Sequence, residues 1–232
     1  MTTKVLRHNR VNQMPTATPP KPSVSAVVFD FGGVLITSIT NQLSKIAQHH
    51  STDVPTMLAI MLGPHESGHH PWHRAERGEL AVAEIQAELA PWAAEHNIVL
   101  RGDEIEALMS PGQYTVIQPM LDKVTELKRR GFKTGLLTNT FAEFRPTMQQ
   151  DLRFGDFTAV VESFAVGSRK PEPDIYQATA DMLGVSHEEI LYLDDFPQNI
   201  EMAQSFGWST IQVSDPLRAI PDIELFLNKN SE

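Results

Sequence analysis

The stretch Val27-Val28-Phe29-Asp30-Phe31-Gly32-Gly33-Val34-Leu35 decides the expected fold of this 232-residue chain. Residues 24–29 are apolar and rich in β-branched side chains, which is typical of a strand that is buried in a sheet. The apolar run ends at Asp30, and the two glycines that follow favour a tight turn. We therefore expect a buried strand with a carboxylate at its end.

Strands and helices alternate along the second half of the chain. We expect helices at 116–130, 171–183 and 197–206, and strands at 133–137, 159–161, 190–193 and 209–213. Alternation of this kind predicts an α/β fold built on a doubly wound parallel sheet.

Polar residues stand at the ends of three expected strands. Asp30 follows the first, Thr138 follows the strand at 133–137, and Asp194-Asp195 follow the strand at 190–193. Ligands of doubly wound sheets bind beyond the carboxyl ends of the strands. The sequence therefore predicts that these side chains meet in one crevice.

The segment 37–113 lacks strand alternation and divides the expected core into residues 24–36 and 114–232. Its apolar spacing predicts helices at 39–50, 54–61, 82–95 and 103–109. We expect an inserted helical cap domain that covers the crevice as a lid. Residues 1–23 are polar and contain prolines, so we expect a flexible tail. Because this tail has basic residues and no acid, a targeting segment is the second interpretation.

The composition limits the classes of partner. A net charge of −10 argues against non-specific attraction to nucleic acid or to anionic membranes. No apolar run approaches the roughly 20 residues that a membrane span needs. The chain has no cysteine, which excludes disulfides and thiolate chemistry and fits a cytoplasmic location. The oligomeric state is left open.

The expected crevice has the residue types that phosphoryl transfer requires. Carboxylates at strand ends suit Mg²⁺, which prefers oxygen ligands. Asp30 with Asp195 or Asp194, and the backbone carbonyl of Gly32, would supply such ligands. A carboxylate nucleophile at Asp30, a hydroxyl donor at Thr138 and a cation at Lys170 would position and neutralise a phosphoryl group.

At this point the chain resembles the haloacid dehalogenase superfamily of hydrolases, in its branch with a helical cap after the first motif. Four segments carry the resemblance: Phe29-Asp30-Phe31-Gly32-Gly33-Val34-Leu35, Leu136-Leu137-Thr138-Asn139, Arg169-Lys170-Pro171-Glu172-Pro173 and Leu193-Asp194-Asp195-Phe196-Pro197-Gln198-Asn199. The similarity implies a nucleophile at Asp30, substrate binding by Thr138 and Asn139, a catalytic and phosphate-binding lysine at Lys170, and an acidic metal motif at Asp194-Asp195. The groups most similar are the phosphatase domain of soluble epoxide hydrolases and bacterial sugar-phosphate phosphatases.

One position departs from the family pattern. Most phosphatases that the chain resembles carry a second aspartate two places after the nucleophile, as general acid for the leaving group, and here that position is Gly32. General acid catalysis typically contributes about 10²–10⁴-fold, so poor leaving groups should react slowly. The predicted function is a Mg²⁺-dependent phosphatase that hydrolyses a small phosphorylated substrate through an aspartyl-phosphate on Asp30.

Other functions compete with this one. A 2-haloacid dehalogenase also uses an aspartate nucleophile but needs no metal, which leaves the Asp194-Asp195 pair unexplained. A phosphomutase depends on the carboxyl that is missing at Gly32. A non-catalytic domain that binds a phosphorylated ligand or a protein is the alternative outside the enzymes.

The segment His65-Glu66-Ser67-Gly68-His69-His70-Pro71-Trp72-His73 is the remaining cluster of polar groups. A zinc site is conceivable, but the histidines lack regular spacing on one helical face, and Gly68 and Pro71 favour a loop. We expect a substrate-facing cap loop in which His73, Arg74 or Trp72 lines the pocket. One such residue, or Glu76, is a candidate to replace the missing acid.

Overall fold

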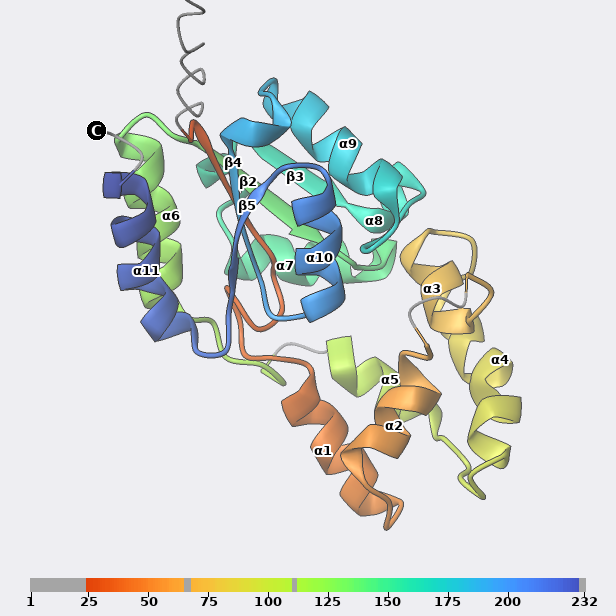
Figure 1. The fold of residues 1–232 in the computed structure, drawn as a ribbon. Coiled ribbons are helices and arrows are strands. Elements are labelled where there is room, and N and C mark those ends of the chain that lie inside the picture. Colours follow the sequence, from red (N-terminus) through yellow and green to blue (C-terminus); the bar gives the residue numbers. More distant parts are fainter. Residues whose placement is uncertain (1–23, 65–67, 110–111, 230–232) are drawn as a thin grey trace, which may run out of the picture.

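The computed structural model describes residues 24–64, 68–109 and 112–229. A five-stranded parallel sheet forms its centre, in the order β3-β2-β1-β4-β5 (Figure 1). The strands are β1 (Ala26–Phe29), β2 (Lys133–Thr138), β3 (Ala159–Glu162), β4 (Ile190–Asp194) and β5 (Ser209–Gln212). The predicted α/β fold with a doubly wound sheet is confirmed, and β1 lies at its centre between β2 and β4.

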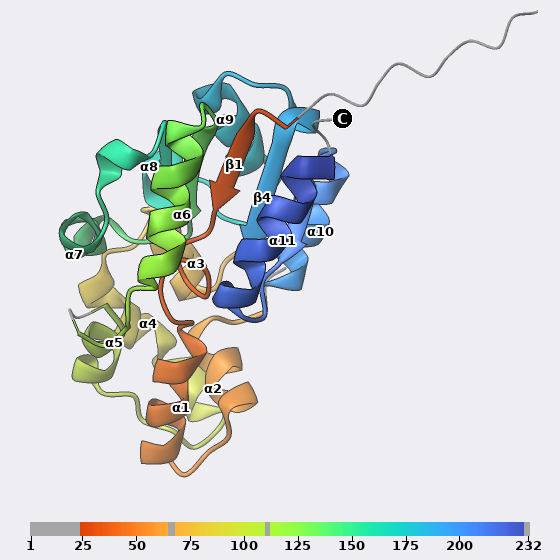
Figure 2. The ribbon, with the colours of Figure 1, turned by 90° about the vertical axis from the view of Figure 1, so that its left-hand side faces the viewer.

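Helices cover both faces of the sheet, because successive strand residues point to opposite sides. Val27 and Phe29 of β1 pack in one core cluster with α6 (Gln118–Arg129) and α11 (Pro216–Lys229). Ala26 and Val28 pack in another with α9 (Pro173–Leu183) and α10 (Pro197–Ser205). Figure 2 shows α6 and α11 side by side over one face. Short helices α7 (Arg145–Asp151) and α8 (Ser163–Val166) complete the core.

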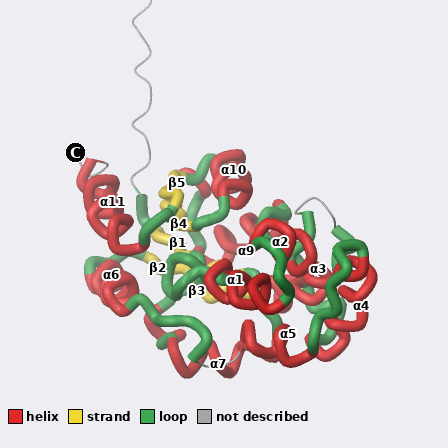
Figure 3. Tube along the Cα trace, turned by 90° about the horizontal axis from the view of Figure 1, so that it is seen from below, coloured by secondary structure: helices red, strands yellow, loops and turns green. Residues whose placement is uncertain are grey.

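The segment between β1 and α6 is helical and has a hydrophobic core of its own. It contains α1 (Thr40–His49), α2 (Val54–Met61), α3 (Pro71–Glu76), α4 (Val82–Ala94) and α5 (Gly102–Met109). Buried Leu43, Met57, Ile85 and Leu89 form the centre of this cluster, which also includes Phe141 from the core side. These helices lie beyond the carboxyl ends of the strands (Figures 1 and 3). The exact division at residues 37 and 113 stays a prediction.

One expectation about secondary structure was wrong. The segment predicted to be a cap loop becomes helical at Pro71, where α3 begins; proline favours the first turn of a helix, and the His70 side chain accepts a hydrogen bond from the Trp72 backbone N–H. No element was predicted where α11 lies, although its buried Ala219, Ile223 and Leu227 follow helical spacing around Pro221. The predicted tail at residues 1–23 lies outside the described residues. No helix in the described ranges has the length and apolarity that a membrane span requires.

Candidate active site

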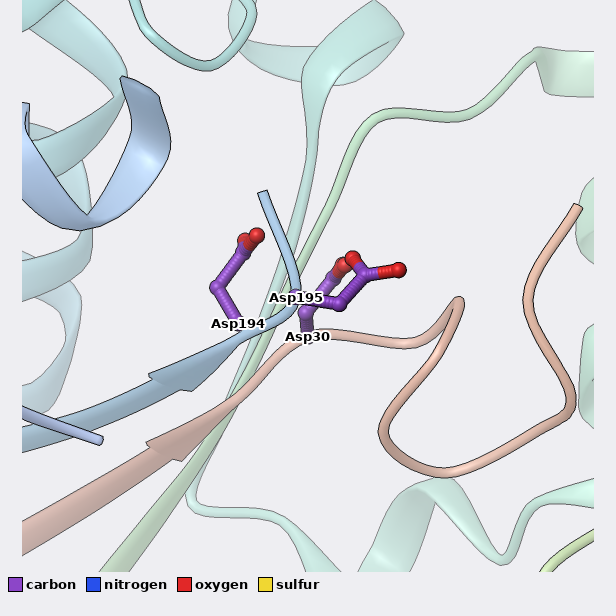
Figure 4. A group of neighbouring side chains, drawn as sticks. All are labelled: Asp30, Asp194 and Asp195. Carbon is purple, nitrogen blue, oxygen red and sulfur yellow. The ribbon is translucent and has the colours of Figure 1, made fainter. Parts of the chain in front are cut away.

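The ends of β1 and β4 bring the predicted acidic residues together. The parallel register pairs Phe29 with Leu193, so Asp30 and Asp194 leave the sheet side by side. The Asp30 backbone N–H donates to the Leu193 carbonyl at 2.9 Å, which fixes the start of the turn. Figure 4 shows the carboxylates of Asp30, Asp194 and Asp195 gathered at this edge. Oxygen atoms of the three lie within 4.8 Å of one another.

Lys170 is the cation that this acidic group contacts. Its ammonium group lies 2.6 Å from Asp30 Oδ1 and 2.8 Å from Asp194 Oδ2, and it donates to the Leu137 carbonyl at 3.1 Å. The side chain is buried, so burial alone would lower the pKa of Lys170; the carboxylates of Asp194 and Asp30 outweigh this and raise it. Lys170 is therefore held in its charged form.

Asn139 positions the backbone of Lys170. Its amide nitrogen donates to the Lys170 carbonyl at 3.0 Å, and its Oδ1 accepts from the Lys170 N–H at 2.8 Å. Thr138 is also buried beside the site, and its hydroxyl lies 3.4 Å from the Asn139 carbonyl. Both residues line the same cavity as Asp30, and substrate contact by either stays a prediction.

The two neighbouring aspartates have different surroundings. Asp194 is fully buried, and its oxygens accept from Lys170, the Tyr192 hydroxyl, the Asn199 amide and the Phe196 N–H. Asp195 accepts from the Ser38 hydroxyl at 3.2 Å through Oδ2. Its buried Oδ1 has no hydrogen-bond partner among the described residues. An unpartnered buried carboxylate oxygen is unfavourable unless something positive binds it.

The electrostatics indicate a shortage of positive charge. Burial raises the pKa of Asp30 well above its ordinary value, Lys170 opposes this, and Asp194 and Asp195 add to it. Burial and the neighbouring Asp194 raise the pKa of Asp195 to about 6. A hard divalent cation would lower these pKa values and satisfy Asp195 Oδ1, so this donor set of carboxylate oxygens fits Mg²⁺.

Two adjacent glycines shape the turn after Asp30 in different ways. Gly33 has φ +70°, and a Cβ there would lie 2.2 Å from Asp195 Oδ2, so only glycine leaves room for the Asp195 carboxylate. A Cβ at Gly32 would meet no atom within 4 Å. The space next to Gly32, where an aspartate side chain is expected in most of the resembling phosphatases, is therefore empty of protein atoms near the Cβ position.

A cavity of about 450 Å³ lies between the cap and the core, with Asp30, Lys170 and Asp195 in its wall. Trp72 and His73 line it, as predicted for the histidine-rich segment. Arg74 does not; it pairs with Glu88 at 3.1 Å. Within residues 24–64, 68–109 and 112–229, the group of His, Asp or Glu that could share an ion is the aspartate cluster, so the described histidines form no zinc site.

Several residues of the site were not predicted from the sequence. Ser38, Tyr192 and Asn199 all bond the acidic pair. Asn199 lies inside the fourth motif, whereas Ser38 and Tyr192 have no local signal. A buried ion pair between Glu76 of α3 and Arg169, which precedes Lys170, also lines the cavity. Pairs this distant along the chain become visible only in the fold.

Comparison with known families gives one strong match. The model of a family described as haloacid dehalogenase-like hydrolases matches residues 24–207. Acyl-CoA dehydrogenase family member 10 of Mus musculus is 30% identical over 88% of this chain, which spans only 19% of that protein. Phosphatase MT3486 of Mycobacterium tuberculosis (strain CDC 1551 / Oshkosh) is 31% identical over 80% of this chain and 85% of its own length.

Solved structures share the fold at lower identity. A predicted HAD-like family hydrolase of Porphyromonas gingivalis has a TM-score of 0.65 at 22% identity, covering 89% of this chain and 98% of its own. A HAD family enzyme of Bacteroides thetaiotaomicron in complex with magnesium and inorganic phosphate has a TM-score of 0.59 at 20% identity. The match covers 83% of this chain and 96% of that enzyme. An L-2-haloacid dehalogenase of Xanthobacter autotrophicus with covalently bound chloropropionic acid has a TM-score of 0.58 at 19% identity. The match covers 81% of this chain and 76% of that enzyme.

Proposed function

Because the chain belongs to the haloacid dehalogenase-like hydrolase family, we propose that it is a magnesium-dependent phosphatase that acts on small organic phosphate monoesters. Family membership makes it a hydrolase; the reaction, the metal and the substrate are the proposal. The observation that carries it is the charge arrangement around Asp30. One cation, Lys170, touches Asp30 and Asp194, while Asp195 presents an unpartnered buried oxygen beside them.

Asp30 is the proposed nucleophile. A carboxylate oxygen forms a bond to phosphorus while the bond from phosphorus to the ester oxygen breaks, and the leaving oxygen keeps the electron pair. Water then attacks phosphorus, which restores the Asp30 carboxylate and releases inorganic phosphate and a proton. Lys170 and the hydroxyl of Thr138 would bind the phosphoryl oxygens as charge shifts onto them. The surrounding bonds hold these groups in place before the substrate arrives.

Asp30, Asp195 and the Gly32 carbonyl are the proposed ligands of Mg²⁺. When bound, the ion neutralises phosphoryl charge and counters the repulsion among the carboxylates. We assign Asp194 a positioning role, because donors from Lys170, Tyr192, Asn199 and Phe196 already use both of its oxygens. A Bacteroides thetaiotaomicron enzyme with this fold was solved in complex with magnesium and inorganic phosphate, which supports magnesium and a phosphorylated substrate for this fold but does not identify the ligand residues.

The first test is phosphate release from acetyl phosphate and a panel of phosphomonoesters by magnesium-loaded protein. We expect release that stops in chelator and in Asp30→Asn. Lack of release from every ester would contradict the proposal. The matched control is Asp122→Asn, since Asp122 is an exposed aspartate on α6 outside the cavity lining; this variant should leave release unchanged.

The glycine at position 32 should restrict the leaving group. Without a carboxyl to donate a proton, esters of acidic hydroxyls should react far faster than esters of simple alcohols. A Cβ at Gly32 would meet no atom within 4 Å, so we expect Gly32→Asp to be accommodated and to raise alkyl ester turnover by about 10²–10⁴-fold. If Gly32→Asp keeps the wild-type preference for esters of acidic hydroxyls, another group already supplies the proton.

A dehalogenase is the second candidate, because the Xanthobacter autotrophicus enzyme shares the fold. Against it stands the unpartnered buried Oδ1 of Asp195 in the cluster with Asp30, which a reaction without metal does not require. Halide release from 2-haloacids that persists in chelator would reverse the ranking. A binding domain without catalysis would instead bind a phosphate mimic in the presence of magnesium and turn over no ester.

A further inference from the structure

The cavity beyond the acidic cluster has apolar walls. On the core side, Phe31, Tyr114 and Phe144 form a triangle of rings with centroids 5.8 to 6.0 Å apart, packed edge to face. On the cap side, Leu58 and Leu62, from α2 and its C-terminal end, and Trp72 of α3 line the same space. Leu58 and Leu62 stay partly exposed although they lie against the apolar core of the cap.

Many of the polar groups in this wall are already occupied by partners in the protein. The charges of Arg169 and Glu76 neutralise each other, and Glu76 also accepts from the Trp72 indole at 3.0 Å. The hydroxyls of Thr37 and Ser38 bond the Thr115 backbone and Asp195. The amides of Gln42 and Gln198 remain as neutral polar groups in the lining, and the ion pair leaves no unpaired charge on Arg169 or Glu76 for the charges of a nucleotide.

We propose that the substrate carries an apolar body, aromatic or aliphatic, on the hydroxyl that is phosphorylated. The inference rests on the proposed phosphatase function and deepens it. The phosphate would lie at Asp30 and Lys170, and the apolar body would extend between the ring triangle and α2. A cavity of about 450 Å³ lies within the size range of small-molecule sites, which are roughly 300–1,000 Å³. A sugar phosphate, the substrate class that the sequence resemblance suggested, would place its hydroxyl groups against these apolar walls.

A series of para-alkylphenyl phosphates tests this inference, because lengthening the alkyl group scarcely changes the acidity of the phenol. With magnesium-loaded enzyme, we expect kcat/KM to rise about fourfold for each methylene from phenyl to para-butylphenyl phosphate. In a matched series of para-hydroxyalkylphenyl phosphates, kcat/KM should rise much less with each methylene. Calorimetric binding of the inert para-butylphenylphosphonate should likewise be tighter than that of phenylphosphonate, which gives a readout without turnover.

A variant that narrows the cavity tests whether the preference for longer alkyl groups arises there. Ala59 is exposed on α2 and lines the cavity, whereas Ala87 is exposed on α4 and does not. Ala59→Trp should reduce the ratio of kcat/KM for para-butylphenyl over phenyl phosphate by on the order of tenfold. Ala87→Trp, the matched control, should keep the wild-type ratio.

The outcomes separate the two proposals. If kcat/KM stays constant or falls along the alkyl series while an Asp30-dependent reaction still hydrolyses phenyl and acetyl phosphate, the proposal of an apolar substrate is overturned. The proposal of a phosphatase then stands. Faster hydrolysis of glucose phosphate than of para-butylphenyl phosphate would have the same two consequences. No Asp30-dependent release from any ester would overturn the phosphatase itself, and the inference with it.

Discussion

At the scale of single residues, Gly33 shows how the turn after Asp30 shapes the acidic cluster. Its φ is positive, and a Cβ at this position would lie 2.2 Å from Asp195 Oδ2, which leaves no space for any side chain. Gly33→Ala should therefore displace the Asp195 carboxylate. We expect a loss of at least about tenfold in kcat/KM and a higher magnesium concentration for half activation.

Gly32→Ala is the control for that substitution, because a Cβ at Gly32 meets no atom within 4 Å. Alanine keeps the backbone carbonyl that is the proposed magnesium ligand, so this variant should retain most of the wild-type activity and magnesium dependence. Equal losses in the two variants would contradict the view that Gly33 is needed for space beside Asp195.

His70 makes a testable contribution to stability. Burial lowers the pKa of its ring from 6.5 to about 4; His73 and Arg169 act in the same direction, and the Ile60 backbone opposes them. The folded protein thus binds this proton less readily than the unfolded chain. Stability due to neutral His70 is complete above about pH 6.5 and is lost as the pH falls toward 4.

Urea unfolding of the wild type and of His70→Gln at several pH values measures this contribution. The difference in unfolding free energy between the two should shrink as the pH falls from 6.5 to 4, because only the wild type has this ring to protonate. A difference that stays constant across that range would contradict the assignment.

At the scale of elements, α3 links the cap to the loop that carries Lys170. Glu76 of α3 pairs with Arg169, and Arg77, which follows α3, pairs with Glu172 at 2.9 Å. The Glu76 and Arg169 side chains are both buried. Removing one partner of a buried pair leaves an uncompensated charge, which typically costs about 3–5 kcal/mol, whereas replacing both with apolar groups is often close to neutral.

A double-mutant cycle tests this link. We expect Arg169→Met and Glu76→Leu each to destabilise the protein by about 3–5 kcal/mol in urea unfolding, and the double variant to be more stable than either single one. Single effects that simply add would show that the two side chains do not interact.

The elements also show which features the sequence could predict. The strands of the core were predicted because each is a short apolar run that ends in a turn or in polar residues. Helix α3 was missed since Gly68 and Pro71 resemble loop residues, and no element was predicted for α11 although its buried residues follow helical spacing. Asp30, Thr138, Lys170 and the acidic pair were found through motifs. Tyr192, Ser38 and the Glu76–Arg169 pair were not, because only the fold brings them to the site.

At the scale of the whole molecule, the site is a product of topology. The central position of β1 places Asp30 between the ends of β2 and β4, and the segment inserted after β1 returns over the same edge (Figure 1). The core thus supplies the charged groups and the cap supplies much of the apolar wall. This division explains why the family reaction can be proposed from motifs, while the proposal of a substrate class depends on the cavity.

The proposed aspartyl-phosphate on Asp30 is tested most directly by mass spectrometry of magnesium-loaded enzyme that is quenched in acid during turnover of phenyl phosphate. We predict one phosphoryl group on the peptide that contains Asp30, and none in Asp30→Asn. Turnover with the phosphoryl group on another residue, or turnover that persists in Asp30→Asn, would contradict the proposed mechanism.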